Sequence, residues 1–309
     1  MSYLLFDLLF LGLPVALLLR RAGRPCARLL AACAALAAVA LVWTAPWDEH
    51  LVRSGVWAYG GDRVLARVGS VPAEEYGFVV LEVLLVASWG HLLGCFAPRS
   101  VTGPSAARLR GCLAWGGVLA VGVALLAAGG TLRYLGLLLV WVAPPLLLQR
   151  AVAGDLLQAR RTDRLLLVLP VALWLCLADR LALADGIWAI APASSTGVLL
   201  LGLPLEEALF FLLTCLLVGD GLVLATDDRA LARARALWAG ARAAMTGLPA
   251  TTERGLLSQR ALEQQPVRGA ADVAPDGVAG GVVEHPRVHG PRGRVAVGLV
   301  QRGHPGNVR

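Results

Sequence analysis

Lysine is absent from this chain of 309 residues, and all 28 basic residues are arginine. Without a lysine amine the chain forms no Schiff base, so a seven-helix photoreceptor of the retinal type and any other lysine-imine chemistry are excluded. Charged residues of both signs are scarce, at 16% of the sequence against about 25% in a soluble domain. Hydrophobic residues make up 57%. This composition predicts that most of the chain lies in a lipid bilayer.

Sequence signatures of metal and redox sites are also missing. The six cysteines show no CxxC pair and no metal-ligand spacing, and most lie within apolar runs, which favours a packing role. His50 and His91 are isolated from other ligand types, which argues against a zinc site. No GxGxxG follows a predicted strand, so a flavin or nicotinamide fold is not indicated. We therefore expect no metal and no cofactor.

The positive charge is concentrated in the C-terminal part of the chain. Residues 1–225 hold 16 arginines against 14 acidic residues, a net charge of +2, whereas residues 226–309 hold 12 against 7, a net charge of +5. The charge of the apolar part therefore does not indicate nucleic-acid binding. Residues 226–245 could form an arginine-rich amphipathic helix on an anionic lipid surface, and the Gly/Pro/Arg-rich sequence beyond predicts disorder.

Seven apolar runs are long enough to span a bilayer, which takes about 20 helical residues. The short connections after the first, third, fifth and seventh runs are rich in arginine, and no cleavable signal peptide is evident. The positive-inside rule then predicts a multi-pass cell-membrane protein with its N-terminus outside and its C-terminus in the cytoplasm. The runs are 3–19, 29–46, 76–97, 111–129, 132–149, 164–183 and 205–225.

An internal repeat organises these helices. Asp48 and Asp179 lie 131 positions apart, as do Trp57 and Trp188, and similar Pro-x-Glu-Glu motifs follow both tryptophans. We expect two parallel repeats of three helices separated by one spacer helix, which places both motifs on the same, non-cytoplasmic side. The sequence thus predicts an all-α integral membrane protein divided into a first repeat at 1–97, a spacer at 98–130, a second repeat at 131–225 and a basic, disordered cytoplasmic tail at 226–309.

The two acidic pairs, Glu74-Glu75 and Glu206-Glu207, each follow a proline at the start of an apolar run. One interpretation is purely structural, because carboxylates stabilise the first turn of a helix. Ionisable groups at membrane depth are costly, however, and usually mark a functional site. Two adjacent buried acids can hold one proton and one negative charge, which suits general acid–base catalysis on a substrate without polar groups.

Aromatic and further acidic residues lie near both pairs in the sequence. Aromatic ring faces stabilise cations, although tryptophan and tyrosine also gather at membrane interfaces without any catalytic role. Glu82 is a lone acid about 10 Å deeper in its helix than Glu75, by the rise of an α-helix. The candidates for cation stabilisation are Trp57, Tyr76, Phe78, Trp188, Phe210 and Phe211, and the candidate supporting acids are Asp48, Asp179 and Glu82.

A set of motifs carries a family resemblance: Trp47-Asp48, Gly55-Val56-Trp57, Pro72 to Phe78, Asp179, Gly186-Ile187-Trp188 and Leu203 to Phe211. Over about residues 1–225 the chain resembles the heterodimer-type bacterial lycopene cyclases, with both subunits fused as in the cyclase half of fungal bifunctional enzymes. It departs from the family pattern at Val79, where a second phenylalanine is usual, and at Glu82, near which a glutamine is usual.

The resemblance implies redox-neutral cyclisation of the linear end groups of lycopene to β-ionone rings, with Glu74, Glu75, Glu206 and Glu207 as the acid–base set. The implied partners are lycopene, the bilayer and other enzymes of the carotenoid pathway. An ε-ring product, a C50 substrate, one or two rings, and the division of acid and base roles remain open. The alternative from another class is a small-solute transporter with three, one and three helices, although its Pro-Gln signature is missing and few Asn or Gln lie in the helices.

Overall fold

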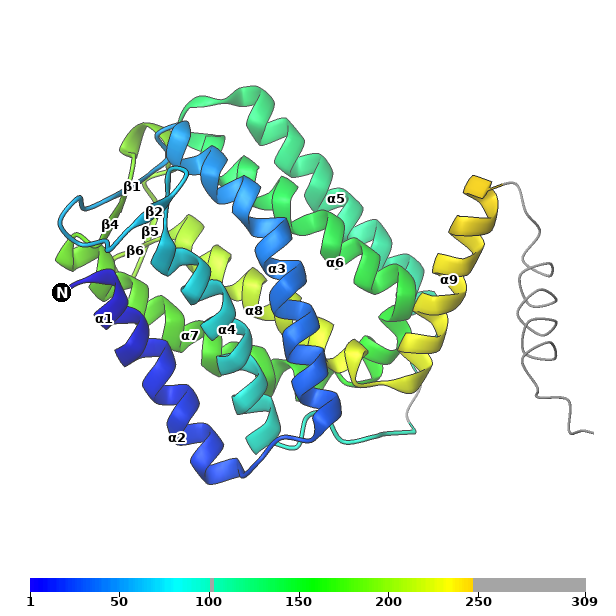
Figure 1. Cartoon of the computed structure of the whole chain (residues 1–309). Coiled ribbons are helices and arrows are strands. Elements are labelled where there is room, and N and C mark those ends of the chain that lie inside the picture. The colour runs from blue at the N-terminus through cyan, green and yellow to red at the C-terminus, as the bar shows by residue number, and fades with distance from the viewer. Residues whose placement is uncertain (101–102, 247–309) are drawn as a thin grey trace, which may run out of the picture. The chain divides into compact units, whose positions relative to one another are not determined.

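Seven helices in the described part of this computed structural model, residues 1–100 and 103–246, are long and apolar enough to cross a membrane (Figure 1). Each coincides with one of the predicted apolar runs, and the prediction of seven apolar helices is confirmed. The first of these spans is built from α1 and α2, with a π-helical turn at Leu8–Gly12 between them. The helices are α1 (Tyr3–Asp7), α2 (Leu13–Ala22), α3 (Ala27–Arg53), α4 (Ala73–Leu92), α5 (Ala106–Ala128), α6 (Arg133–Ala159), α7 (Arg161–Asp185), α8 (Leu205–Ala225) and the non-spanning α9 (Asp228–Thr246).

The fold is mostly helical, as predicted, and it adds short strands that the sequence did not predict. The α3–α4 and α7–α8 connections each contain short antiparallel strands, and one further ladder joins the two connections. Backbone N–H and C=O groups near the hydrocarbon region must find partners within the protein, and these ladders supply them. The paired strands are β2 (Arg67–Val68) with β3 (Val71–Pro72), β5 (Leu199–Leu200) with β6 (Leu203–Pro204), and β1 (Trp57–Tyr59) with β4 (Trp188–Ile190).

The β1–β4 ladder connects segments that lie 131 positions apart in the sequence. Ala58 faces Ala189 at its centre, with Tyr59 opposite Trp188 on one side. All the strands cluster at the end of the helices where α4 and α8 begin, and the N-terminus lies at the same end (Figure 1). Both Pro-x-Glu-Glu motifs are therefore at one end of the helical body, as predicted.

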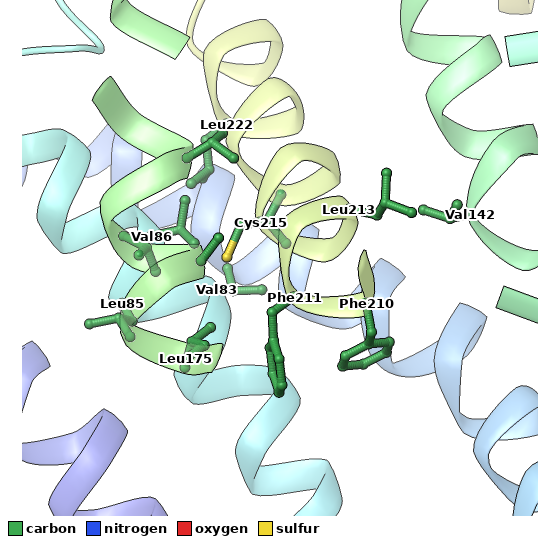
Figure 2. Packing of buried hydrophobic residues seen from close by; sticks show 14 of the residues in the cluster. Val83, Leu85, Val86, Val142, Leu175, Phe210, Phe211, Leu213, Cys215 and Leu222 are labelled. Carbon is green, nitrogen blue, oxygen red and sulfur yellow. The ribbon is translucent and has the colours of Figure 1, made fainter. Parts of the chain in front are cut away.

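The helices α4 and α8 form the centre of the apolar core. Val83 and Val86 of α4 pack with Cys215 and Leu222 of α8 and with Leu175 of α7 (Figure 2), and all five side chains are buried. By contrast, α5 packs mainly along α6 and only Ala107 and Gly122 of its residues are buried, as expected for a peripheral helix in lipid. This packing fixes the first turns of α4 and α8 next to each other.

Ion pairs tie the helices together at the other end. Asp220 of α8 is fully buried and accepts hydrogen bonds from Arg150 of α6, at 2.7 Å, and from Arg164 of α7. Asp155 of α6 is bound by Arg233 of α9 at 2.8 Å, which docks the predicted amphipathic helix onto this end. The helical part of the predicted tail is thus observed at 228–246, while the disorder predicted beyond about residue 246 lies outside the described residues.

Candidate active site

Proline and glutamate together explain how α4 and α8 begin. Pro72 and Pro204 are the residues before each first turn, with φ of −56° and −53° and extended ψ. Proline has no N–H to satisfy and its fixed φ suits a helix entry, while glutamates in the first turn face the positive end of the helix dipole. All four glutamates of the motifs are nevertheless buried, with at most 7% of any one exposed. Helix initiation alone does not require such burial.

The first glutamate of each pair binds the connection that precedes its helix. The Oε1 atom of Glu74 accepts the backbone N–H of Leu65 at 2.6 Å. In the same way, Oε1 of Glu206 accepts the backbone N–H of Thr196 at 2.6 Å, and its Oε2 accepts the hydroxyl of Ser195 at 3.2 Å. These two carboxyl groups hold the connections in place.

The second glutamate of each pair binds tyrosine hydroxyls instead. Oε2 of Glu75 accepts hydrogen bonds from Tyr3 at 2.7 Å and from Tyr59 at 2.8 Å, and Oε1 of Glu207 accepts one from Tyr134. Tyr59 lies in β1, and burial together with the neighbouring Glu75 carboxyl raises the pKa of this phenol well above its usual range. Tyr59 therefore remains a proton-bearing donor to Glu75 at all physiological pH values.

A third carboxyl group, that of Asp179, joins Glu75 and Glu207. Its Oδ1 accepts the indole N–H of Trp188 at 2.7 Å, whereas its Oδ2 is buried without a hydrogen-bond partner among the described residues. These three acids line one small chamber with a volume of about 30 Å³, close to that of one water molecule. The remaining lining is aromatic: Tyr3, Trp57, Tyr59, Phe78, Trp188, Phe210 and Phe211.

The aromatic rings form a continuous cluster beside the acids. Phe210 stacks on Trp47 with centroids 6.0 Å apart, and Trp47 stacks on Trp141 at 4.5 Å. Phe211 contacts Phe78 across the α4–α8 interface at 6.1 Å, and Figure 2 shows Phe210 and Phe211 leaving α8 side by side. Of these rings, Phe78, Phe210 and Phe211 line the chamber, where aromatic rings can stabilise a positive charge.

An apolar groove of about 450 Å³ lies next to the chamber, between α3 and α6, with α4 and α8 as its floor. Glu75, Phe78 and Phe210 line both the chamber and the groove, so the two spaces share one wall. Glu82 lies further along the floor. The groove has the size of a small-molecule site, for which about 300–1,000 Å³ is typical.

The predicted site residues fall into four groups in the structure. Eight of them line the chamber: Glu75, Glu207, Asp179, Trp57, Phe78, Trp188, Phe210 and Phe211. Glu82 lines only the groove, and Glu74 and Glu206 bind the connections. Asp48 is buried without a partner for its Oδ1, and Tyr76 is partly exposed; neither is part of the chamber lining.

Four aromatic residues of the candidate site were not singled out in the sequence at all, and a fifth, Trp47, was named only within a family motif. The four are Tyr3, Tyr59, Tyr134 and Trp141. Tyr3 and Tyr134 lie 131 positions apart, which is the spacing of Trp57 and Trp188, so extending the repeat into the first helix of each half would have found them. Tyr59 could have been suspected only from its nearness to Trp57. Nothing in the local sequence marks Trp141, which reaches the cluster from the middle of α6.

Fold and site together define a multi-span helical protein in which buried carboxyl groups meet between aromatic rings beside an apolar groove. The sequence pattern of the lycopene cyclase family matches residues 1–93 and 131–220, and the chain belongs to this family. The two matched ranges leave out the segment that contains α5.

Several curated relatives support this assignment. The lycopene beta-cyclases of two Halobacterium salinarum strains, R1 and NRC-1, are 41% identical to the chain over 197 residues, which is 61% of this chain and 79% of theirs. A bifunctional lycopene cyclase/phytoene synthase of Arthroderma gypseum is 33% identical over 226 residues, covering 63% of this chain and 36% of the fungal protein. No solved structure matches the chain.

Proposed function

We propose that this protein converts lycopene to a carotenoid with β-ionone rings, as an isomerase that uses acid–base chemistry. The family match and the two archaeal lycopene beta-cyclases at 41% identity support the reaction. The observation that carries the proposal is the chamber, in which Glu75, Glu207 and Asp179 meet against a lipid-side apolar groove. Such a site serves a substrate with no polar group of its own.

The proposed reaction balances without a redox cofactor. A carboxyl group donates a proton to the terminal carbon–carbon double bond of the linear end group, which leaves a tertiary cation. A second double bond of the same end group attacks this cation and closes a six-membered ring, and the charge moves onto the ring. A carboxylate then removes a ring proton to form the ring alkene. One proton enters and one leaves.

The contacts favour a division of roles between the acids. Glu207 and Asp179 line the same chamber, and Oδ2 of Asp179 is buried without a hydrogen-bond partner among the described residues. Two buried charges of the same sign are costly, so a proton on this pair relieves the cost. We therefore assign proton donation to the Glu207–Asp179 pair. Glu75 accepts two phenol hydroxyls on one oxygen, as suits a carboxylate, and it lines the groove as well, so we assign it the role of base. The aromatic cluster holds the cation between them.

We further propose that the site is shared between two parallel repeats related by a pseudo-twofold axis. The β1–β4 register supports this, because Trp57 pairs with Ile190 while Tyr59 pairs with Trp188, so each strand meets the equivalent segment of the other repeat about the central Ala58–Ala189 pair. On this view the chain corresponds to the two subunits of the heterodimer-type bacterial cyclases joined through the α5 region.

The proposed membrane topology places the N-terminus and the chamber on the outer side of the cell membrane and α9 on the cytoplasmic side. The arginine bias of the connections supports it. Arg150, Arg164 and Arg233, whose ion pairs lie at the end opposite to the chamber, are part of that bias. Lipid and other carotenoid-pathway enzymes remain proposed partners.

The direct test is expression of this single chain in a host that accumulates lycopene, followed by chromatography of the extracted pigments. We expect ring-containing products with the mass of lycopene, and none from a variant that carries both Glu75→Gln and Glu207→Gln. Unchanged lycopene with the wild-type chain present in the membrane would contradict the proposal and favour the transporter alternative. The same chromatograms separate β-rings from ε-rings, and a host that makes C50 carotenoids tests the longer substrate.

A further inference from the structure

A second apolar groove lies on the other flank of the helical body, between α2 and α7. It has a volume of about 390 Å³ and is lined by α2, α4 and α7. Each of its eight lining residues stands 131 or 132 positions from a lining residue of the α3–α6 groove. Leu17 corresponds to Leu148, for example, and Trp174 to Trp43. The two grooves are thus equivalent surfaces of the two halves of the chain.

The two grooves differ in whether acidic residues line them. Glu75 and Glu82 line the α3–α6 groove, whereas no acidic residue is among those that line the α2–α7 groove. At the chamber end of the α2–α7 groove, the indole N–H of Trp174 donates to the backbone carbonyl of Phe10 at 2.7 Å and their rings pack at 6.1 Å. This contact joins α7 to the first transmembrane span.

The far ends of the grooves differ as well. Trp89 lines the α2–α7 groove, and its indole N–H is held by the carbonyl of Leu166 at 2.9 Å. The equivalent position in the α3–α6 groove is Gly221, against which the side chain of Leu36 packs. From Phe210 to Gly221 the floor of the α3–α6 groove extends about 16 Å by helix rise. The α2–α7 groove has an indole ring in place of this glycine.

We infer that the linear end of the carotenoid enters sideways from the bilayer through the α3–α6 groove, and that the α2–α7 groove takes no part in the reaction. This inference rests on the proposed function. The lips of the α3–α6 groove are lipid-facing apolar side chains, with Val39 of α3 67% exposed and Leu148 of α6 61% exposed. The rod-like polyene lies along the apolar floor towards Gly221, and its end group meets Glu75 at the wall shared with the chamber.

One consequence is that a single end group reacts at a time. A groove that reaches the acids on only one flank leaves no second route for the other end of the same molecule. A product with two rings therefore requires release of the one-ring carotenoid and re-entry by its opposite end.

The test narrows one groove at a time with a matched pair of substitutions. Leu148→Trp and Leu17→Trp place the same ring at equivalent lipid-facing positions, 61% and 54% exposed in the wild type. We expect Leu148→Trp to lower the rate of ring formation in isolated membranes by about tenfold or more, because displaced reacting groups lose orientation. Leu17→Trp should stay within about twofold of the wild type on the same argument.

Protein amount and detergent-extracted size are measured for both variants, since the substitution itself could impair folding. If Leu148→Trp does not fold, Val39→Trp narrows the same groove from its other lip and must give the same loss. Equal losses in Leu148→Trp and Leu17→Trp, or a loss confined to Leu17→Trp, would overturn the inference while the wild-type chain still forms rings. A wild-type chain that forms no rings would instead overturn the proposed function.

Discussion

Tyr3 and Tyr134 occupy equivalent positions 131 residues apart, and each donates its phenol hydroxyl to the second glutamate of a Pro-x-Glu-Glu motif. The two phenols are fully buried, so both contacts form away from water. Each half of the chain thus contributes one tyrosine–glutamate pair, and both glutamates line the same chamber. The pairs are not identical, because Tyr59 adds a second donor to Glu75 alone.

Because Glu75 has two phenol donors and Glu207 has one, removing a single tyrosine hydroxyl should affect the cyclisation rate differently in the two halves. Tyr134→Phe removes the phenol donor of Glu207 and should lower cyclisation about 10- to 100-fold, as expected for a hydrogen bond to a charged or proton-sharing group worth about 1.5–3 kcal/mol. Tyr3→Phe leaves Tyr59 on Glu75 and should cost only a few-fold. The double variant Tyr3→Phe/Tyr59→Phe should match Tyr134→Phe. The ratio of cyclic product to lycopene, followed over time, measures the rate of all three variants. Equal effects of Tyr134→Phe and Tyr3→Phe would contradict the proposed role of Tyr59 as a second donor to Glu75.

The two glutamates within each motif should differ strongly. In Glu75→Gln and Glu207→Gln the acid–base group is lost, so we expect a decrease in rate of about 10²–10⁴-fold. Glu74→Gln and Glu206→Gln keep a side-chain oxygen for the N–H groups of Leu65 and Thr196, so these variants should retain most of the activity. They are matched controls of the same size and charge change. Loss of activity in all four variants would contradict the assignment of different roles to the first and second glutamate of each motif.

Solvent deuterium tests the proposed proton balance. When cyclisation runs in membranes suspended in D₂O, each ring should gain one deuterium from the donor, because the proton that is removed comes from another carbon. Mass spectrometry of the purified product measures this directly, with the same reaction in H₂O as the reference. A ring product that carries no deuterium would require a donor sealed from solvent throughout turnover, or a different mechanism.

The buried ion cluster at the other end of α8 should control stability rather than chemistry. Asp220 is 0% exposed and binds Arg150 and Arg164, so Asp220→Asn leaves two cations uncompensated and should cost about 3–5 kcal/mol. Asp228, whose side chain is 87% exposed, pairs with Arg28, and Asp228→Asn should cost about 0–1 kcal/mol. Thermal denaturation in detergent compares the two. Similar midpoints would argue against the cluster as a structural anchor.

Much of this fold was predictable because hydrophobicity acts locally. Each spanning helix appears as an uninterrupted apolar run, and the prolines and glutamates mark where α4 and α8 begin. The strands were not predictable, because β1 and β4 are three residues long and pair across 131 positions. Such ladders depend on which segments the helices bring together, and no local pattern records that.

The residue types of the candidate site were predictable, but the different hydrogen-bond partners of its acidic residues were not. Adjacent acids in one motif look equivalent in sequence, yet the helix turn directs Glu74 to the backbone of Leu65 and Glu75 to two phenols. The repeat spacing of 131 positions also relates Tyr3 to Tyr134 and Phe10 to Trp141. That Trp141 and not Phe10 stacks on Trp47 depends on the packing of α6, which no sequence spacing records.

The short β1–β4 ladder aligns the side chains that hold the proposed acid and the proposed base. Tyr59 and Trp188 are partners across it, and they hold Glu75 and Asp179 respectively. A slip of one residue would place Tyr59 and Trp188 on opposite faces of the ladder. At most one of the two contacts could then persist. The register of three residue pairs therefore couples the position of the proposed base to that of the proposed donor pair.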